Sequence, residues 1–263
     1  MNALNQLKTN KPFKHPFMKK ITLLLAWLCT SVTFAQVARV TYVDFNQSKT
    51  KEIKALIKKK TQTYNNTVEG EKFYTFQVEA GEKTGQIVRF LFSESYGQID
   101  SYPKEGNDWW AKNITPKVNG YSGAEFMSFN AEASHDVRKP GANTVAKVLF
   151  YKIKPGHGKD FWRYRTNIAK AAAELGETVS LSVWNSGVGG VPGRVIVFYA
   201  HEDFSGIDKE AEAWPKVIEK YNELFGGSFE DDSVAFRASL EMWGNYSEIW
   251  RFLPELSSPL MQE

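Results

Sequence analysis

Residues 145–161, VAKVLFYKIKPGHGKDF, decide the fold. The segment opens on a run of mostly β-branched and aromatic residues, a composition that favours a β-strand. Pro155 and Gly156 end the strand, and beyond Asp160 apolar residues recur at steps of three to four, which is typical of an amphipathic helix. Gly176 stands where the C-terminal cap of that helix is expected. The stretch therefore begins a strand–turn–helix unit.

Four further elements follow this helix. Strands are predicted over residues 178–184, 194–201 and 233–243, and a second helix over residues 208–225. The glycine-rich segment 187–193 joins two strands and lacks a Gly-Lys-Ser/Thr ending, which indicates a hairpin turn and not a phosphate-binding loop. The order β-α-β-β-α-β is that of the ferredoxin-like unit, in which two helices cover one face of a four-stranded sheet.

The sequence contains two copies of this unit. Residues 37–40 recur as residues 145–148, and the same shift of 108 places residues 85–90 on residues 193–198. One displacement that aligns separated segments indicates a tandem duplication. The elements predicted for the first copy are residues 37–45, 48–64, 73–79, 85–93, 108–118 and 125–132.

The ends of the two copies align once one residue is inserted, which places Met127–Glu132 on Phe236–Glu241. The predicted organisation is a leader of residues 1–35, a first repeat of residues 36–133, a linker of residues 134–144, a second repeat of residues 145–246 and a tail of residues 247–263. Within the tail, Trp250, Phe252 and Leu253 have helical spacing and are expected to cover a sheet edge or a barrel mouth.

Both faces of each predicted sheet are apolar. Leu149 and Tyr151 lie on one face of their strand, and Val148 and Phe150 lie on the other. An open sheet with two apolar faces needs a second layer on each. The fold class is therefore α+β, with two ferredoxin-like βαββαβ repeats that stack sheet to sheet around a barrel-like interior and carry their helices outside.

This pattern resembles a known superfamily. The element order, the turn Lys154-Pro155-Gly156-His157-Gly158 that leads into the first helix, and the duplication are similar to the dimeric α/β barrels, which include antibiotic-biosynthesis monooxygenase-like and NIPSNAP-like domains. The resemblance implies a fused dimeric α/β barrel around a cavity that holds a ligand. Activities in the superfamily range from cofactor-free oxygenation and haem breakdown to none known. The turn is structural, so the resemblance transfers no catalytic residue.

The leader resembles a signal peptide. Lys19 and Lys20 precede an apolar run from Ile21 to Val32, and a small-residue site follows that predicts cleavage after Ala35. Met18 is then the expected start of translation. The alternative is a short membrane anchor, but about 12 apolar residues fall short of the roughly 20 that span a bilayer. We therefore expect a periplasmic or extracellular protein that has no membrane segment after cleavage.

Composition excludes several classes of function. The formal charge of +3 arises in the leader, whose lysines have no acidic partners there, so the charge does not indicate nucleic-acid binding. Cys29 is the only cysteine and lies in the leader, which leaves the mature chain without disulfides or cysteine nucleophiles. The histidines have no metal-ligand spacing, so we expect no metal and no cofactor. The duplication is compatible with a monomer that mimics a dimer.

Candidate ligand-binding residues come from the strand positions that carry polar groups. Successive residues of a strand point to opposite faces of its sheet. The positions that carry polar groups are assigned to the lumen. The alternate positions are assigned to the layer under the helices, and they include Val88, Phe90, Phe92, Ile196, Phe198 and Phe236. His201 is the sharpest candidate because an imidazole can act as a base. The alternative is that these groups pair with one another or face solvent. The candidates are Arg89, Tyr199, His201, Arg237 and Glu241.

Two functions from different classes are compatible with this sequence. The favoured one is an exported module that binds a small, partly apolar ligand, or a partner, through a cavity between the two repeats. The alternative is a cofactor-free monooxygenase or a haem-degrading type of enzyme, in which His201 or Tyr199 assists proton transfer. A lumen packed solid with aromatic side chains would instead favour a structural or partner-binding role.

Overall fold

The computed structural model describes residues 37–67, 71–137 and 144–259. The predicted leader with Met18 and Cys29, and residues 138–143 of the predicted linker, lie outside the described residues. Within the described part, no helix is long and apolar enough to cross a membrane.

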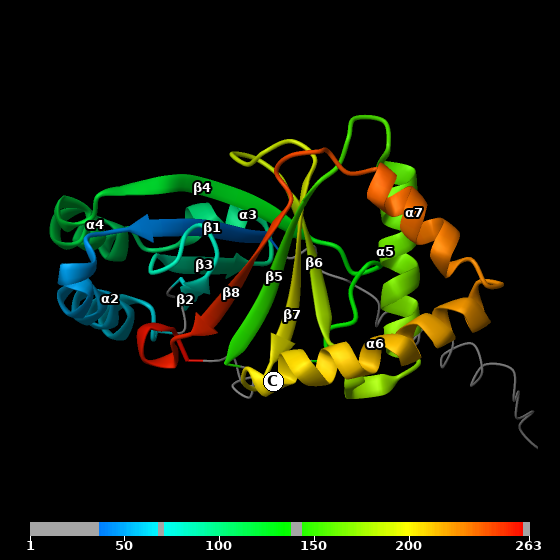
Figure 1. The fold of residues 1–263 in the computed structure, drawn as a ribbon. Coiled ribbons are helices and arrows are strands. Elements are labelled where there is room, and N and C mark those ends of the chain that lie inside the picture. Colours follow the sequence, from blue (N-terminus) through cyan, green and yellow to red (C-terminus); the bar gives the residue numbers. More distant parts are fainter. Residues whose placement is uncertain (1–36, 68–70, 138–143, 260–263) are drawn as a thin grey trace, which may run out of the picture. The chain divides into compact units, whose positions relative to one another are not determined.

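Eight antiparallel strands form a closed barrel in the order β1-β3-β2-β8-β5-β7-β6-β4 (Figure 1). The four strands before residue 130 are contiguous in this ring, as are the four after residue 144, and the two groups join where β2 pairs with β8 and β4 pairs with β6. The strands are β1 (Val37–Asp44), β2 (Phe73–Ala80), β3 (Ile87–Ser93), β4 (Gly120–Phe129), β5 (Val145–Lys152), β6 (Leu181–Ser186), β7 (Arg194–His201) and β8 (Tyr246–Phe252).

The helices lie outside the barrel in two groups. Helix α2 contacts α4, while α5 contacts both α6 and α7 beside β5, β6 and β7 (Figure 1). The helix predicted after the turn at residues 154–158 is confirmed as α5. The helices are α2 (Thr50–Tyr64), α3 (Tyr96–Ser101), α4 (Glu105–Asn113), α5 (Gly158–Ala173), α6 (Ser205–Leu224) and α7 (Phe229–Ala238), with short 3-10 turns at Gln47–Lys49, Thr115–Lys117, Gly176–Thr178 and Pro254–Leu256.

Three apolar clusters stabilise this arrangement. One draws residues from all eight strands and none from a helix, so it fills the lumen of the barrel. The second joins α5, α6 and α7 to β6 and β7, and the third joins α2 to β1 and β3. An eight-stranded barrel is just wide enough for side chains to fill its interior. Each sheet is therefore buried on both faces, as its sequence predicts.

The middle of the lumen is packed with aromatic rings. The Phe90 ring lies 5.7 Å, centroid to centroid, from each of Phe76, Phe92, Phe198 and Trp250. Phe76 and Phe90 belong to the first half of the chain, whereas Phe198 and Trp250 belong to the second. Edge-on and offset ring pairs of this kind add about 0.5–1.5 kcal/mol each beyond the area they bury. The two halves therefore share one aromatic core.

The two faces of the sheets are the reverse of our prediction. Val88, Phe90, Ile196 and Phe198 belong to the lumen cluster, and Phe92 packs against it, although they were expected under the helices. Tyr199 instead lies with the helix-covered cluster. The reason is that the narrow lumen is filled by large apolar rings, while polar side chains under the helices find partners on those helices. The assignment of the polar strand positions to the lumen is therefore wrong.

The prediction of a last strand over residues 233–243 is also wrong. Residues 233–238 lie in helix α7, and the closing strand is β8, which lies, except for its first residue, in the segment expected to be a tail. Acidic residues at positions 230–232 occupy the first turn of α7 and Arg237 its last turn, a distribution that the helix dipole favours. The alignment of Met127–Glu132 with Phe236–Glu241 therefore matches the end of a strand with the end of a helix, and is wrong.

The second helix of each half also differs from its prediction. In the first half, α3 and α4 replace the single helix expected over residues 108–118. In the second half, α6 begins at Ser205 and not at residue 208, and the Ser205 amide at this end donates a hydrogen bond to Asp203 Oδ1 at 2.8 Å.

Candidate functional site

Arg89 lies outside the lumen, beneath α2 and α4. Only 3% of its surface is exposed, and its guanidinium lies over the rings of Phe73 and Trp110, 4.0 and 4.8 Å from their centroids. It donates long hydrogen bonds of 3.4 Å to the hydroxyls of Thr75 and Thr61. Burial lowers the pKa of Arg89 to about 9.

Tyr199 and His201 lie on the helix-covered face of β7. The Tyr199 hydroxyl accepts a hydrogen bond from Arg165 Nη2 at 3.3 Å. His201 Nε2 lies 3.1 Å from Glu210 Oε2 of α6, and the other oxygen of Glu210 binds the Lys147 ammonium. Burial would raise the pKa of Glu210, but the contacts with His201 and Lys147 outweigh it and hold that pKa below its usual value. The structure therefore pairs Tyr199 and His201 with a group of three charged residues that the sequence analysis missed, Lys147, Arg165 and Glu210.

Arg237 and Glu241 do not join this group. Arg237 lies on α7, donates a hydrogen bond of 2.6 Å to Ser233 Oγ, and lies 3.6 Å from the exposed Glu230. Glu241 follows α7 in a turn, where its amide donates to the carbonyl of Lys152 at 2.8 Å. The predicted site set is thus divided among three places on the molecule.

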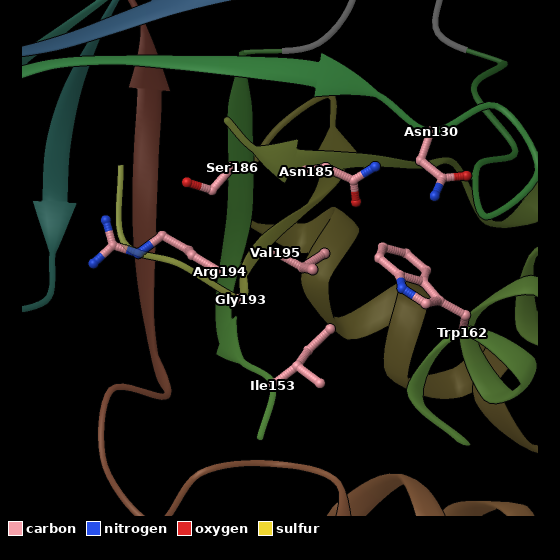
Figure 2. Close-up of a pocket in the computed structure, with 8 residues that line it drawn as sticks. All are labelled: Asn130, Ile153, Trp162, Asn185, Ser186, Gly193, Arg194 and Val195. Carbon is pink, nitrogen blue, oxygen red and sulfur yellow. The ribbon is translucent and has the colours of Figure 1, made fainter. Parts of the chain in front are cut away.

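A groove of about 400 Å³ lies on the helix side of the second half, close to the junction of β4 and β6 (Figure 2). Asn130 follows β4, and its backbone N–H donates a hydrogen bond to the backbone carbonyl of Val183 at 2.9 Å. Both halves of the chain therefore contribute to the groove. The residues that line it are Asn130, Ile153, Trp162, Asn185, Ser186, Gly193, Arg194 and Val195.

The groove combines an aromatic wall with amide groups. Figure 2 shows the side chains of Asn130 and Asn185 near one another on one side, with the Trp162 indole facing them from α5. Asn185 Oδ1 is buried and has no hydrogen-bond partner among the residues that the structure describes. A buried carbonyl oxygen without a partner costs about 1–3 kcal/mol. The groove is therefore short of one hydrogen-bond donor.

Arg194, the charged residue of the lining, points its side chain away from the groove. Figure 2 shows the Arg194 side chain extending away from Trp162, to the other face of its strand. There its Nη1 donates to Glu125 Oε2 at 3.1 Å. No other ionisable side chain of the described residues lines the groove, and an arginine does not release its proton at neutral pH. The lining can bind a ligand by stacking and hydrogen bonds but offers no group for proton transfer.

Sequence reasoning could have found part of this site. Lys147 interrupts an apolar strand, which signals a buried ionic partner on a covering element. Asn185 likewise ends an apolar strand on the helix-facing parity, once the faces are assigned correctly. Trp162 gives no such signal, because an aromatic residue near a helix start is typical of ordinary packing. Among residues 37–67, 71–137 and 144–259, no group of three or more His, Cys, Asp or Glu side chains could hold a metal ion.

Comparisons with known proteins identify the fold. No protein-family model and no curated protein matches the sequence. A "putative monooxygenase" from Fusobacterium nucleatum has a TM-score of 0.62 at 14% identity, covering 84% of this chain and 94% of that one. A "putative monooxygenase" from Lactobacillus acidophilus has a TM-score of 0.58 at 6% identity, covering 87% and 100%. A chlorite dismutase variant from Candidatus Nitrospira defluvii has a TM-score of 0.51 at 10% identity, covering 90% and 96%.

Identities this low establish architecture alone. The similarity extends over most of this chain and nearly all of each neighbour, so it concerns the whole barrel and not a single motif. The chain therefore has the same fold as these neighbours, an α+β barrel of eight antiparallel strands.

Proposed function

We propose that the protein binds a small, neutral, partly apolar ligand in the groove of Figure 2. The observation that carries this proposal is the buried and unpartnered Asn185 Oδ1, which faces the same groove as the Trp162 ring. A ligand with a flat apolar body and one O–H or N–H donor would stack on the indole and supply the missing hydrogen bond. Because Arg194 already pairs with Glu125, no uncompensated charge attracts an ion.

The test compares phenol with anisole, which keeps the ring but replaces the hydroxyl donor by a methyl ether. Isothermal titration calorimetry should detect phenol binding and weaker anisole binding. Trp162→Ala and Asn185→Leu should each weaken phenol binding by about tenfold, the equivalent of about 1.4 kcal/mol. The controls are Trp243→Ala and Asn66→Leu, which alter exposed residues away from the groove. Equal affinity for phenol and anisole, or unchanged phenol binding in both groove variants, would refute the proposal.

We also propose that the two halves are tandem copies of one ferredoxin-like unit and that the protein is exported as a monomer. The order β4-β1-β3-β2 in the first half corresponds element by element to β8-β5-β7-β6 in the second, which supports the duplication. The apolar run before Ala35 supports export. Intact-mass measurement of protein from the host should give a chain that begins at residue 36. A chain that retains residues 19–35 would refute cleavage there.

A monooxygenase type of enzyme is the second candidate function. It is favoured by the contact of His201 with Glu210, since a histidine held by a carboxylate is a common general base, and by the monooxygenase names of two structural neighbours. Oxygen uptake with hydroquinone as substrate, lost in His201→Gln and retained in His157→Gln, would support it. A haem-degrading form would require the protein to bind added haem. Absence of both oxygen uptake and haem binding would rule out this second candidate, and ligand binding in the groove would then be the only proposed function.

A further inference from the structure

Glu248 is a buried carboxylate at one end of the barrel lumen. It is 1% exposed, and one of its oxygens, Oε2, accepts hydrogen bonds from Trp250 Nε1 at 2.6 Å and from the Tyr42 hydroxyl at 3.2 Å. The other oxygen, Oε1, is also buried and has no hydrogen-bond partner within the described part of the chain. An ionisable group in such a place is costly unless something pairs with it.

Two further acceptor oxygens, for which the described residues provide no hydrogen-bond partner, lie at the same end of the lumen. Glu125 Oε1 and Ser186 Oγ are both buried, while the second oxygen of Glu125 binds Arg194. In the ring of strands, three strands separate β4, which carries Glu125, from β8, which carries Glu248, in either direction. The unpartnered carboxylate oxygens therefore come from opposite walls of the barrel.

Lys83 already places an ammonium group at this end. Its Nζ lies over the Tyr42 ring, 3.6 Å from the centroid, in the geometry of a cation–π contact. Lys83 belongs to the hairpin between β2 and β3, whose backbone lies against Glu248: a Cβ on Gly81 would come within 2.8 Å of Glu248 Cγ. Burial lowers the pKa of Lys83, and the charge of Glu248 opposes that change.

The surroundings are aromatic and contain no metal-binding cluster. The Tyr246 ring stacks on Phe150 at 4.3 Å, and the Tyr42 ring meets Trp250 edge-on at 5.9 Å. The described residues hold no group of three or more potential metal ligands. A carboxylate among aromatic rings recognises organic ammonium ions, because the rings and the carboxylate both attract positive charge and the carboxylate accepts N–H bonds.

We propose that this end of the lumen, formed by Tyr42, Glu125, Ser186, Tyr246 and Glu248, is a binding site for a small alkylammonium ion that is anchored on Glu248 Oε1. The ligand's ammonium takes the place at the mouth that the Lys83 side chain occupies in the structure. Lys83 is thus a tethered competitor, and its hairpin must move aside when the ligand enters. The site shares Ser186 with the groove of Figure 2 but is otherwise different, because the groove residues Trp162 and Val195 belong to the helix-covered cluster, whereas Glu248 lies in the lumen.

Calorimetry with butylammonium chloride on the full chain tests this proposal, with 1-butanol as the neutral ligand of matched size. The wild type should bind butylammonium and not 1-butanol. Lys83→Met removes the competing charge and keeps the side-chain stem, so it should bind butylammonium about tenfold more tightly. Glu248→Gln should weaken binding at least tenfold. Lys58→Met and Glu212→Gln alter exposed helix residues and should leave the affinity unchanged.

Denaturation midpoints of all variants establish that they are folded. If Glu248→Gln does not fold, the gain of affinity in Lys83→Met carries the test, because that residue lies on a hairpin and not within the core. The proposal is overturned if neither the wild type nor Lys83→Met binds butylammonium, if a folded Glu248→Gln binds it as the wild type does, or if 1-butanol binds equally well. Phenol binding at the groove should be the same in all these variants.

Discussion

The Tyr42 hydroxyl and the Glu248 carboxylate, 206 positions apart in the sequence, are joined by a hydrogen bond of 3.2 Å across the barrel lumen. Tyr42 lies on β1 and Glu248 on β8, and two other strands separate these in the ring. The bond therefore crosses the interior and does not follow the wall of the barrel. It links the first described strand to the last one, so opening either half exposes a polar group of the other.

The position of Glu248 predicts a pH-dependent stability. Burial raises the pKa of Glu248 above the value of 4.5 that it has when exposed, despite hydrogen bonds from Trp250 and Tyr42. The folded state then binds more protons than the unfolded state above pH 4.5, so this group's contribution to stability falls as the pH rises through its folded pKa. Glu248→Gln should remove that loss of stability, which amounts to about 1.4 kcal/mol for each unit by which the pKa in the folded state exceeds that in the unfolded state.

Urea denaturation at intervals from pH 4 to pH 8 measures this effect. The free energy of unfolding of Glu248→Gln, relative to the wild type, should increase with pH. Glu212→Gln changes an exposed carboxylate and should show no such trend. A difference between Glu248→Gln and the wild type that is constant over the whole range would contradict the prediction.

The sequence predicted the barrel better than it predicted the orientation of side chains within it. The strand at residues 145–152 and the strand at 194–201 were found because their β-branched and aromatic residues persist on both faces. Because both faces are apolar, the sequence does not show which face of a strand points into the lumen and which lies under the helices. Alternation of apolar and polar residues identifies the buried face only when the other face is polar. Arg89 and Tyr199 were therefore placed in the lumen, although their polar atoms meet partners on the helix side.

The candidate lumen site was missed for a related reason. Tyr246, Glu248 and Trp250 alternate along β8, but Trp250, Phe252 and Leu253 also fit helical spacing, and short apolar segments do not distinguish the two periods. The acidic start of α7 was a stronger signal that residues 229–238 form a helix. Contacts between the halves, such as that of Tyr42 with Glu248, depend on the closing of the ring and have no local signature.

Lys60 predicts a second pH dependence, of opposite sign. It is 1% exposed, and burial together with the neighbouring Arg89 lowers its pKa to about 7, although Glu71 lies 3.5 Å from its Nζ. Between about pH 7 and pH 10.5 the unfolded chain binds more protons at this residue, so its contribution makes the protein more stable as the pH rises. Lys60→Met should therefore exceed the wild type in stability by a few kcal/mol, on the order of the pKa shift, at pH 6.

This advantage of Lys60→Met should shrink as the pH approaches 10, where the wild-type lysine is uncharged in the folded state. Asn107 and Arg39 remain near Glu71 in the variant, at 3.2 and 3.8 Å. Chemical denaturation at pH 6, 8 and 10 provides the measurement, with Lys58→Met as the exposed control. An advantage that does not depend on pH would show that Lys60 is charged in the folded protein throughout.

Phe90 tests whether the halves share one core. Its ring contacts rings from both halves and only 2% of its surface is exposed. Phe90→Ala should lower the free energy of unfolding by about 3–5 kcal/mol, because the closed lumen cannot collapse around the missing ring. Trp243→Ala, at a residue that is 79% exposed, should change it by less than about 0.5 kcal/mol. Equal small losses in both variants would mean that the lumen rings are loosely packed.

The contact of the β6–β7 hairpin with β4 yields the last prediction. The Gly187 amide donates to the carbonyl of Phe126 at 2.7 Å, and the Phe126 amide donates to the carbonyl of Val188 at 2.9 Å, so a turn of the second half lies on a strand of the first. Gly189 has a φ of +82°, and a Cβ there would overlap the backbone oxygen of Ala124. Gly226 has a similar φ of +67° but has no atom within 4 Å of such a Cβ.

Substituting alanine at these two glycines separates backbone strain from steric overlap. Gly226→Ala carries only the strain of a left-handed backbone, about 1 kcal/mol. Gly189→Ala carries the same strain and must also push the hairpin off β4, so it should cost about 1–3 kcal/mol more. Urea denaturation of the two variants gives the comparison directly. If both lose the same stability, the hairpin does not rest on β4, and the junction of the two halves depends on strand pairing alone.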